Sequence, residues 1–356
     1  MKSPGRAALS TMVVVTGSIV ASAHLDEPSS GSPPGRYVTA PARLEAITRA
    51  QVWSPTNVAS MDIKAGPPGV GAFAPGETVT CDYIDTKMRG KSPKFTCLLR
   101  PDDQLIVKYG RQNGEVYAEV AATRLLWALG FGANRVYPVG VVCRGCPERV
   151  QDTSVASIQR TMAGNDIETA DVTGWAWPEL DRVDPGAGGA PRAHRDALKL
   201  LAVFMQHTDS KPEQQRIVCL DKPGSTEGQT CAHPFMMMHD VGLTFGSANR
   251  FNRDNAGSVN LEGWSKRRIW KDSTGCVANL PKSMTGSLEH PGITEEGRKF
   301  LADLLQQLTD AQLGDLFSMA RFAQRTEVKQ DPGAVTMRWV EAFHRKRDDI
   351  VQRRCQ

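Results

Sequence analysis

The sequence predicts an α+β protein with two lobes: a small antiparallel β-rich lobe carrying one helix, and a larger, mainly helical lobe. Two patterns predict this class. Three strand-like runs separated by short turns lie between residues 78 and 109. After residue 192, apolar residues recur with the period of a helix. The chain has 356 residues, 40% of them hydrophobic, and is long enough to bury a core in each lobe.

The first lobe is expected over residues 78–150. It begins as an antiparallel meander, because a basic turn from Lys87 to Pro93 and a second turn from Pro101 to Asp103 separate consecutive strands. The predicted strands are 79–84, 95–99, 104–109 and 135–143. A helix over 115–129 is predicted between the last two, because its apolar residues recur at helical spacing until Gly130.

The second lobe is expected over residues 151–356. Two strand-like runs, 216–220 and 233–238, form a predicted hairpin within a mainly helical region. The predicted helices are 192–207, 295–308, 310–321 and 334–352.

The start of the chain has the pattern of a secretory signal. Lys2 and Arg6 precede an apolar stretch over 7–20, and Ala21-Ser22-Ala23 offers the small residues that signal peptidase requires. We therefore expect a signal peptide over 1–23, export to the periplasm or the medium, and a mature protein without a membrane span. Residues 24–77 are expected to be a linker and N-terminal extension, with a short helix near 42–52 and a second linker-like run over 64–76.

All eight cysteines follow the predicted signal, and an even number in an exported chain indicates disulfides. Two pairs are favoured because each joins consecutive strand-like runs: Cys81 with Cys97, and Cys219 with Cys231. The motif Cys143-Arg-Gly-Cys146 is interpreted as a structural bridge or turn, since the sequence has no second CxxC to complete a zinc site.

Charge excludes one class of function. Lys and Arg number 43 and Asp and Glu 39, which gives a formal net charge of +4. This is too small for a field that attracts nucleic acid, so no nucleic-acid partner is expected.

The most informative run is 207–214, between a predicted helix and a strand-like segment. Phosphoryl transfer needs a carboxylate to accept a hydroxyl proton, a cation beside the phosphate and oxygen ligands for a metal. Asp209, Lys211 and Gln214 supply these groups on one short loop. Asp240 follows an apolar strand and is a candidate second metal ligand. His207 is expected to brace the loop through a hydrogen bond to the backbone.

The run from His207 to Gln214 resembles the HxDxKPxN catalytic loop of the protein-kinase-like superfamily, and Asp240-Val241-Gly242 resembles its DFG triplet. Lys108 in Leu-Ile-Val-Lys resembles the β3 lysine, and Glu119 its partner on the following helix. Glu115 shares the helix face of Glu119 and is the alternative partner; Glu119 is preferred because the small residues that follow it let the helix approach the sheet closely. The resemblance spans roughly residues 78–245. It implies a two-lobed protein-kinase-like fold that holds Mg-ATP between its lobes.

Carried onto this chain, the resemblance makes Asp209 the catalytic base, and Lys211 the group that steadies the phosphate. It implies that Lys108 contacts the ATP phosphates and pairs with Glu119. Gln214 and Asp240 would then hold Mg²⁺ or Mn²⁺.

At three positions the sequence differs from the usual pattern of the superfamily, and these differences make it resemble atypical branches. Gln214 stands where the family has Asn, Val241 replaces Phe, and no GxGxxG precedes Lys108. The secretory-pathway kinases, the HipA-type kinases and the phosphatidylinositol 3/4-kinases are the branches that the chain resembles.

The expected function is transfer of the ATP γ-phosphate to an acceptor whose class, protein, lipid or small molecule, the sequence leaves open. Two alternatives remain on the same fold: a pseudokinase that binds or scaffolds, and an enzyme that transfers AMP. The sequence also leaves the oligomeric state open.

Overall fold

The computed structural model describes residues 37–88, 90–221, 231–246, 258–283, 286–325 and 331–355. The chain divides into two compact units, 1–32 and 33–356, and the account below concerns the second. The predicted signal peptide over 1–23 lies outside the described residues. Among the helices that the structure describes, none is long and apolar enough to cross a membrane.

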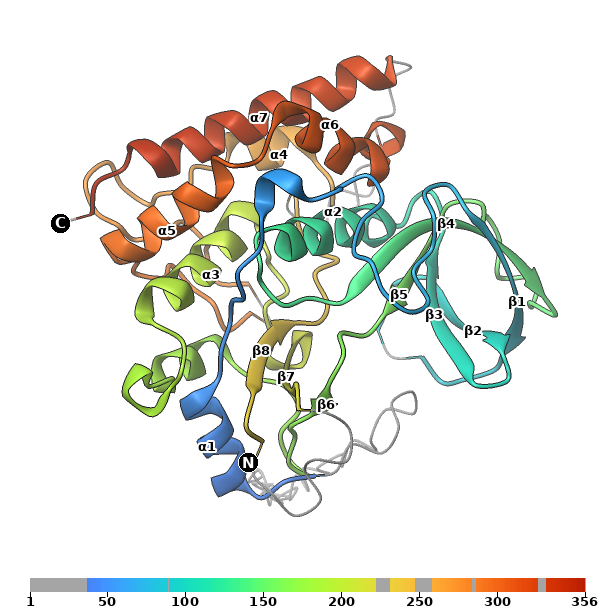
Figure 1. Ribbon diagram of the computed structural model, residues 1–356. Helices are drawn as coiled ribbons and strands as arrows, with labels where there is room; N and C mark the ends of the chain where they lie inside the picture. Colours follow the sequence, from blue (N-terminus) through green and yellow to red (C-terminus); the bar gives the residue numbers. More distant parts are fainter. Residues whose placement is uncertain are drawn as a thin grey trace, which may run out of the picture. The chain divides into compact units, whose positions relative to one another are not determined.

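Five strands form a closed barrel in the order β1-β2-β3-β5-β4 (Figure 1). They are β1 (Thr78–Ile84), β2 (Lys94–Arg100), β3 (Asp103–Tyr109), β4 (Arg135–Arg144) and β5 (Ala156–Arg160). The predicted antiparallel meander is confirmed for β1, β2 and β3. The expectation of a purely antiparallel sheet is wrong, because β1 pairs in parallel with β4 and so closes the barrel.

Closure follows from the alternation of side chains along the strands. Buried and exposed side chains alternate along the strands, and the apolar ones point into the barrel. The interior contains Val79, Cys81, Phe95, Cys97, Phe73, Leu105, Val107, Tyr137, Val139, Val141, Ala156 and Ile158. Since closure removes the sheet's free edges, the barrel offers a fixed frame for the residues on its outer face.

The barrel extends beyond the boundary expected near residue 150, because β5 pairs with both β3 and β4.

Residues 64–76 were expected to be a linker, and the structure differs. The Tyr137 hydroxyl donates to the Pro67 carbonyl (2.7 Å), and Arg160 Nε donates to Gly71 (3.0 Å). Phe73 is buried against Tyr137 with its ring centroid 5.7 Å away. A segment of linker-like composition is thus fixed by tertiary contacts.

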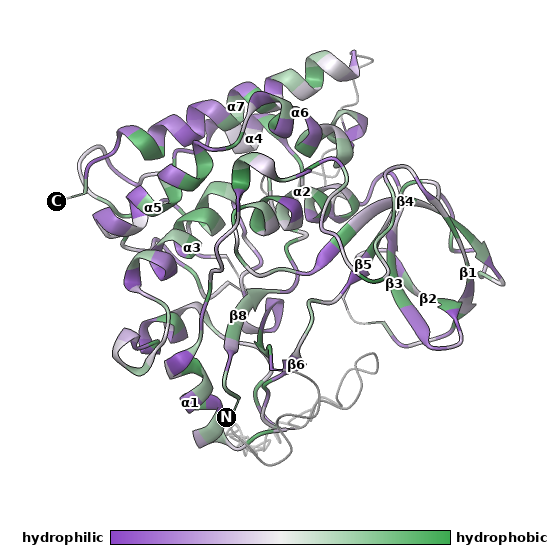
Figure 2. Cartoon of the chain, viewed as in Figure 1, coloured by the Kyte–Doolittle hydropathy of each residue, from purple (hydrophilic) through white to green (hydrophobic). Residues whose placement is uncertain are grey.

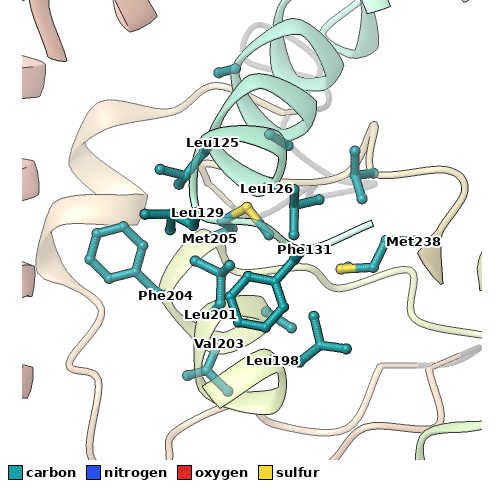
Figure 3. Close-up of a cluster of buried hydrophobic side chains, with 14 of the residues drawn as sticks. Leu125, Leu126, Leu129, Phe131, Leu198, Leu201, Val203, Phe204, Met205 and Met238 are labelled. Atoms are coloured by element: carbon teal, nitrogen blue, oxygen red, sulfur yellow. The ribbon is translucent and has the colours of Figure 1, made fainter. Parts of the chain in front are cut away.

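The described helices are α1 (Ala40–Arg49), α2 (Glu115–Ala128), α3 (Arg192–Met205), α4 (Leu261–Lys266), α5 (Glu295–Leu305), α6 (Asp310–Met319) and α7 (Pro332–Gln352). The helices predicted after residue 192 are confirmed within three residues of their ends. Helix α2 contacts β3, β4 and β5 on one side and α6 on the other. Its C-terminal end joins α3 and the strand that precedes Asp240 in one apolar core (Figure 3).

A second sheet has the order β6-β7-β8, with β6 (Asn165–Asp166), β7 (Gln215–Cys219) and β8 (Pro234–Met238). All five residues of β8 are buried, and the strand is hydrophobic in Figure 2. Met236, Met237 and Met238 therefore serve the core. The hairpin of β7 and β8 brings the loop that precedes β7 beside the residues that follow β8.

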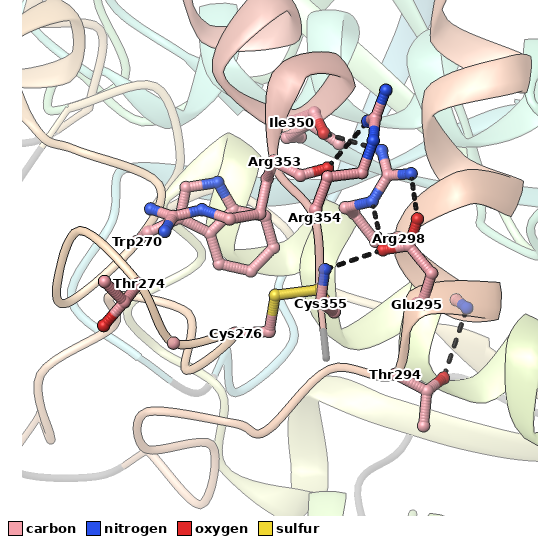
Figure 4. Close-up of a disulfide and its surroundings, with 12 residues drawn as sticks. Trp270, Thr274, Cys276, Thr294, Glu295, Arg298, Ile350, Arg353, Arg354 and Cys355 are labelled. Carbon is pink, nitrogen blue, oxygen red and sulfur yellow. Dashed lines mark hydrogen bonds and ion pairs between the residues drawn. A yellow bond between two sulfur atoms is a disulfide. The ribbon is translucent and has the colours of Figure 1, made fainter.

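Every cysteine is in a disulfide. The predicted pairs Cys81–Cys97 and Cys219–Cys231 are confirmed, and Cys143–Cys146 closes a bridge. The fourth bridge, Cys276–Cys355, joins residues 79 positions apart in the sequence. No local sequence pattern could indicate a pairing over this separation. In Figure 4, the backbone N–H of Cys355 donates to Glu295, which also binds Arg298.

The fourth bridge should stabilise the fold most among the bridges, because the entropy removed from the unfolded chain grows with the loop that is closed. Serine at both Cys276 and Cys355 should lower the free energy of unfolding by about 4 kcal/mol. The matched control, serine at Cys143 and Cys146, should lower it by about 2 kcal/mol. Urea denaturation measures both values, and equal losses would contradict the prediction.

Candidate functional site

A buried lysine connects three separate elements. Lys108 near the end of β3 is only 4% exposed. Its ammonium nitrogen lies 2.6 Å from Glu119 Oε1 and 2.7 Å from Glu115 Oε2, both on α2. Asp240 Oδ1, which follows β8, lies 3.6 Å away. The structure therefore brings together Lys108, Glu119 and Asp240, as the sequence led us to expect, and the alternative partner Glu115 contacts the lysine as well.

Local structure explains this meeting. Along β3, Val107 points into the barrel and Lys108, one residue later, points to the opposite face, where α2 packs. Glu115 and Glu119 are four residues apart and share one face of α2. Gly242 allows the close approach of the third element, since a Cβ there would lie 2.7 Å from Glu115 Cγ.

Burial and charge act against each other in this cluster. Burial favours the neutral form of Lys108, but the three carboxylates outweigh it and raise its pKa well above the ordinary value. Burial raises the pKa of Glu119 to about 8, although Lys108 opposes this shift. For Asp240, burial would raise the pKa, and the attraction of Lys108 lowers it below the ordinary range. The lysine thus keeps Asp240 ionised.

The same carboxylates form a candidate metal site. Glu115, Glu119 and Asp240 each offer an oxygen, and these atoms lie within 4.8 Å of one another. Glu119 Oε2 is buried and has no hydrogen-bond partner among the described residues. Because clustered carboxylate oxygens are the donors that Mg²⁺ and Mn²⁺ prefer, the residues fit such a cation. Asp240 belongs to this set as the sequence predicted, while Glu115 and Glu119 were not predicted as ligands.

The loop before β7 lies against the residues that follow β8. The backbone carbonyl of Gln214 accepts hydrogen bonds from the N–H groups of His239 (2.8 Å) and Asp240 (3.1 Å). Its side-chain amide donates to Asp209 Oδ2 at 2.9 Å. Gln214 therefore holds both Asp209 and the backbone of Asp240 in place. Lys211 is half-buried and forms no ion pair with any described residue.

His207 does not brace the loop as expected. Its backbone N–H donates to the Ala202 carbonyl (2.9 Å), but both ring nitrogens are buried without a partner among the described residues. Ser210 braces the loop instead, because its hydroxyl accepts from the N–H of Leu288 (3.3 Å) and its carbonyl from the hydroxyl of Ser287 (2.9 Å).

One residue of the site escaped the sequence analysis. Ser92, in the turn between β1 and β2, donates a hydrogen bond to Glu115. Glu115 was the alternative to Glu119 because the two share a helix face, and both contact Lys108. No sequence pattern indicates Ser92, because its turn reaches the site only when the barrel has closed.

The buried ring of His207 should make the fold sensitive to acid. Burial lowers its pKa from 6.5 to about 4. Between pH 6.5 and pH 4, His207 is therefore protonated in the unfolded chain and neutral in the folded chain. Its contribution to stability is lost as pH falls through this window, by about 1.4 kcal/mol per pH unit. His207→Leu should lower the measured slope by this amount and leave stability at pH 7.5 unchanged or higher, while His239, whose pKa burial lowers to about 3, keeps its own contribution. Denaturation at pH 7.5, 6 and 5 tests it; an unchanged slope would contradict it.

Comparison with known proteins adds no family. No protein-family model matches the chain. No curated protein is similar to it in sequence. Among solved structures, it is similar to the proinflammatory kinase CtkA of Helicobacter pylori, with 10% identity over 78% of this chain and 96% of that one and a TM-score of 0.41. It is also similar to the Rio2 kinase of Chaetomium thermophilum, solved as an ADP/Mg²⁺–phosphoaspartate complex, with 11% identity over 68% and 71% and a TM-score of 0.26. Similarities of this size establish neither fold family nor activity, so the functional conclusion depends on the geometry above.

Proposed function

We propose that the chain is an atypical kinase-like phosphotransferase, in which the barrel with α2 is the nucleotide-binding lobe and the helical region is the catalytic lobe. One observation carries the proposal: Lys108 of β3 lies within 2.6 Å of Glu119 on the next helix and 3.6 Å of Asp240 after β8. Two consecutive elements and a third that follows much later in the sequence supply these groups, in the order that the kinase-like superfamily uses.

Asp240 would hold Mg²⁺ or Mn²⁺, with Gln214 as the ligand that the resemblance implies and Glu115 and Glu119 as the neighbours that the geometry adds. The ion, when bound with ATP, neutralises charge on the phosphates. Lys108 keeps Asp240 ionised and fixes α2 against the barrel.

Asp209 would accept the proton of the acceptor hydroxyl while the hydroxyl oxygen bonds to the γ-phosphorus and ADP leaves. The amide of Gln214 donates to Asp209 and so orients the base. Lys211, half-buried and without an ion pair among the described residues, would steady the transferred phosphate.

We also propose that the protein works outside the cytosol. All eight cysteines are paired in four disulfides, and such bonds persist in oxidising compartments. The acceptor is a protein, a lipid or a small molecule.

The direct test incubates the protein with ATP labelled at either the α- or the γ-phosphate, in the presence of Mg²⁺ or Mn²⁺ and candidate acceptors. Transfer of the γ label supports the proposal. Transfer of the α label identifies an AMP-transferring enzyme, and binding without transfer identifies a pseudokinase module. Either result would overturn phosphoryl transfer.

Two substitutions should separate the base from the metal ligand. Asp209→Ala should lower the rate of transfer about 10²- to 10⁴-fold with little effect on Mg-ATP binding, because the base acts on the acceptor. Asp240→Ala should weaken metal-dependent nucleotide binding as well as transfer, because it removes a charged ligand. Asp303→Ala, at an exposed position of α5, is the control. Calorimetry and the label assay measure these effects, and parental behaviour of both variants would reject the assigned roles.

A further inference from the structure

A second lysine lies directly opposite Lys108. In the antiparallel pairing of β2 and β3, Lys94 and Lys108 are partners at the same register position. Directly opposed residues project to the same face of a sheet, so both side chains leave the barrel on the face that carries the acidic cluster. Their neighbours Phe95 and Val107, also partners, point into the barrel interior.

The two lysines differ in their partners. Lys108 has three carboxylate oxygens within 3.6 Å, so its charge is already balanced. Lys94 is half-buried and forms no ion pair with any residue that the structure describes. Like charges directly opposite each other in a sheet are unfavourable. Burial, followed by repulsion from Lys108, lowers the pKa of Lys94 accordingly.

The turn between β1 and β2 contacts both this ammonium and the acidic cluster. An added Cβ at Gly90 would lie only 3.2 Å from Lys94 Nζ, so the lysine folds back beside that glycine. Ser92 of the same turn donates to Glu115 in the acidic cluster. Lys94 thus lies beside Gly90, in the turn that contacts the acidic cluster, and this glycine has no side chain to keep an anionic ligand from the ammonium.

We propose that Lys94 is a phosphate-binding residue for the nucleotide and that, with the turn at Gly90, it replaces the missing glycine-rich loop. This inference rests on the proposed function and names the part of the ligand that Lys94 recognises. Charge supports it: among the described residues Lys108 is already paired with carboxylates and Lys94 is not, so an anionic group of the ligand would balance the charge of Lys94.

The experiment compares binding of Mg-ATP, Mg-ADP and adenosine by calorimetry. Lys94→Met should weaken binding of ATP and ADP about 10- to 100-fold, the range for loss of one charge-assisted hydrogen bond, and leave adenosine binding unchanged. Lys94→Arg should retain most of the affinity. The matched control is Lys91→Met, which removes the same charge from an exposed position of the same turn and should leave all three affinities unchanged.

Two outcomes overturn the inference. If Lys94→Met binds ATP as the parent does, the lysine only balances the acidic cluster, and the proposed function stands because the parent still binds and transfers. If Lys94→Met loses adenosine and ATP equally, the lysine supports the fold and not the phosphates. Failure of the Lys94 inference differs from failure of the proposed function, because in the second case the parent protein itself binds no Mg-ATP.

Discussion

The buried ammonium of Lys108 is the constraint on which the rest of the site depends. A lysine that is 4% exposed requires compensating charge, because an unpaired buried charge costs several kcal/mol. Glu115 and Glu119 supply it from α2, and Asp240 supplies it from the end of β8. Barrel, helix and hairpin must therefore meet at one point. The ion pairs contribute specificity of arrangement more than stability, since apolar packing of the same volume would stabilise the core as well.

The frame around this point is rigid on both sides. The closed barrel fixes the direction of Lys108, and uniformly buried β8 fixes the position of Asp240. Helix α2 lies between them, anchored by an apolar core that includes Leu125, Leu126 and Phe131 (Figure 3). Because each element is held by packing away from the charges, the charged groups are preorganised and do not have to order one another.

The elements of this arrangement could be predicted from the sequence because their signals are local. Alternating residues from 78 to 109 predict strands, and the spacing in α2 predicts a helix. The meeting of Lys108, Glu119 and Asp240 was expected because their order and motifs resemble those of the protein-kinase-like superfamily. What could not be predicted depends on contacts distant in sequence. The parallel pairing of β1 with β4, the Cys276–Cys355 bridge and the packing of residues 64–76 arise only in the folded chain.

The glutamine of the loop connects two of the charged residues. Gln214 turns its amide nitrogen to Asp209 at 2.9 Å, and its backbone carbonyl accepts a hydrogen bond from the N–H of Asp240. The amide nitrogen that donates to Asp209 cannot coordinate a cation, so only the side-chain oxygen of Gln214 remains for that role. Glu115, Glu119 and Asp240 each offer a carboxylate oxygen, and these atoms lie within 4.8 Å of one another. The glutamine of the loop thus orders Asp209 and the backbone of Asp240, while the acids of α2 are the oxygen donors beside Asp240.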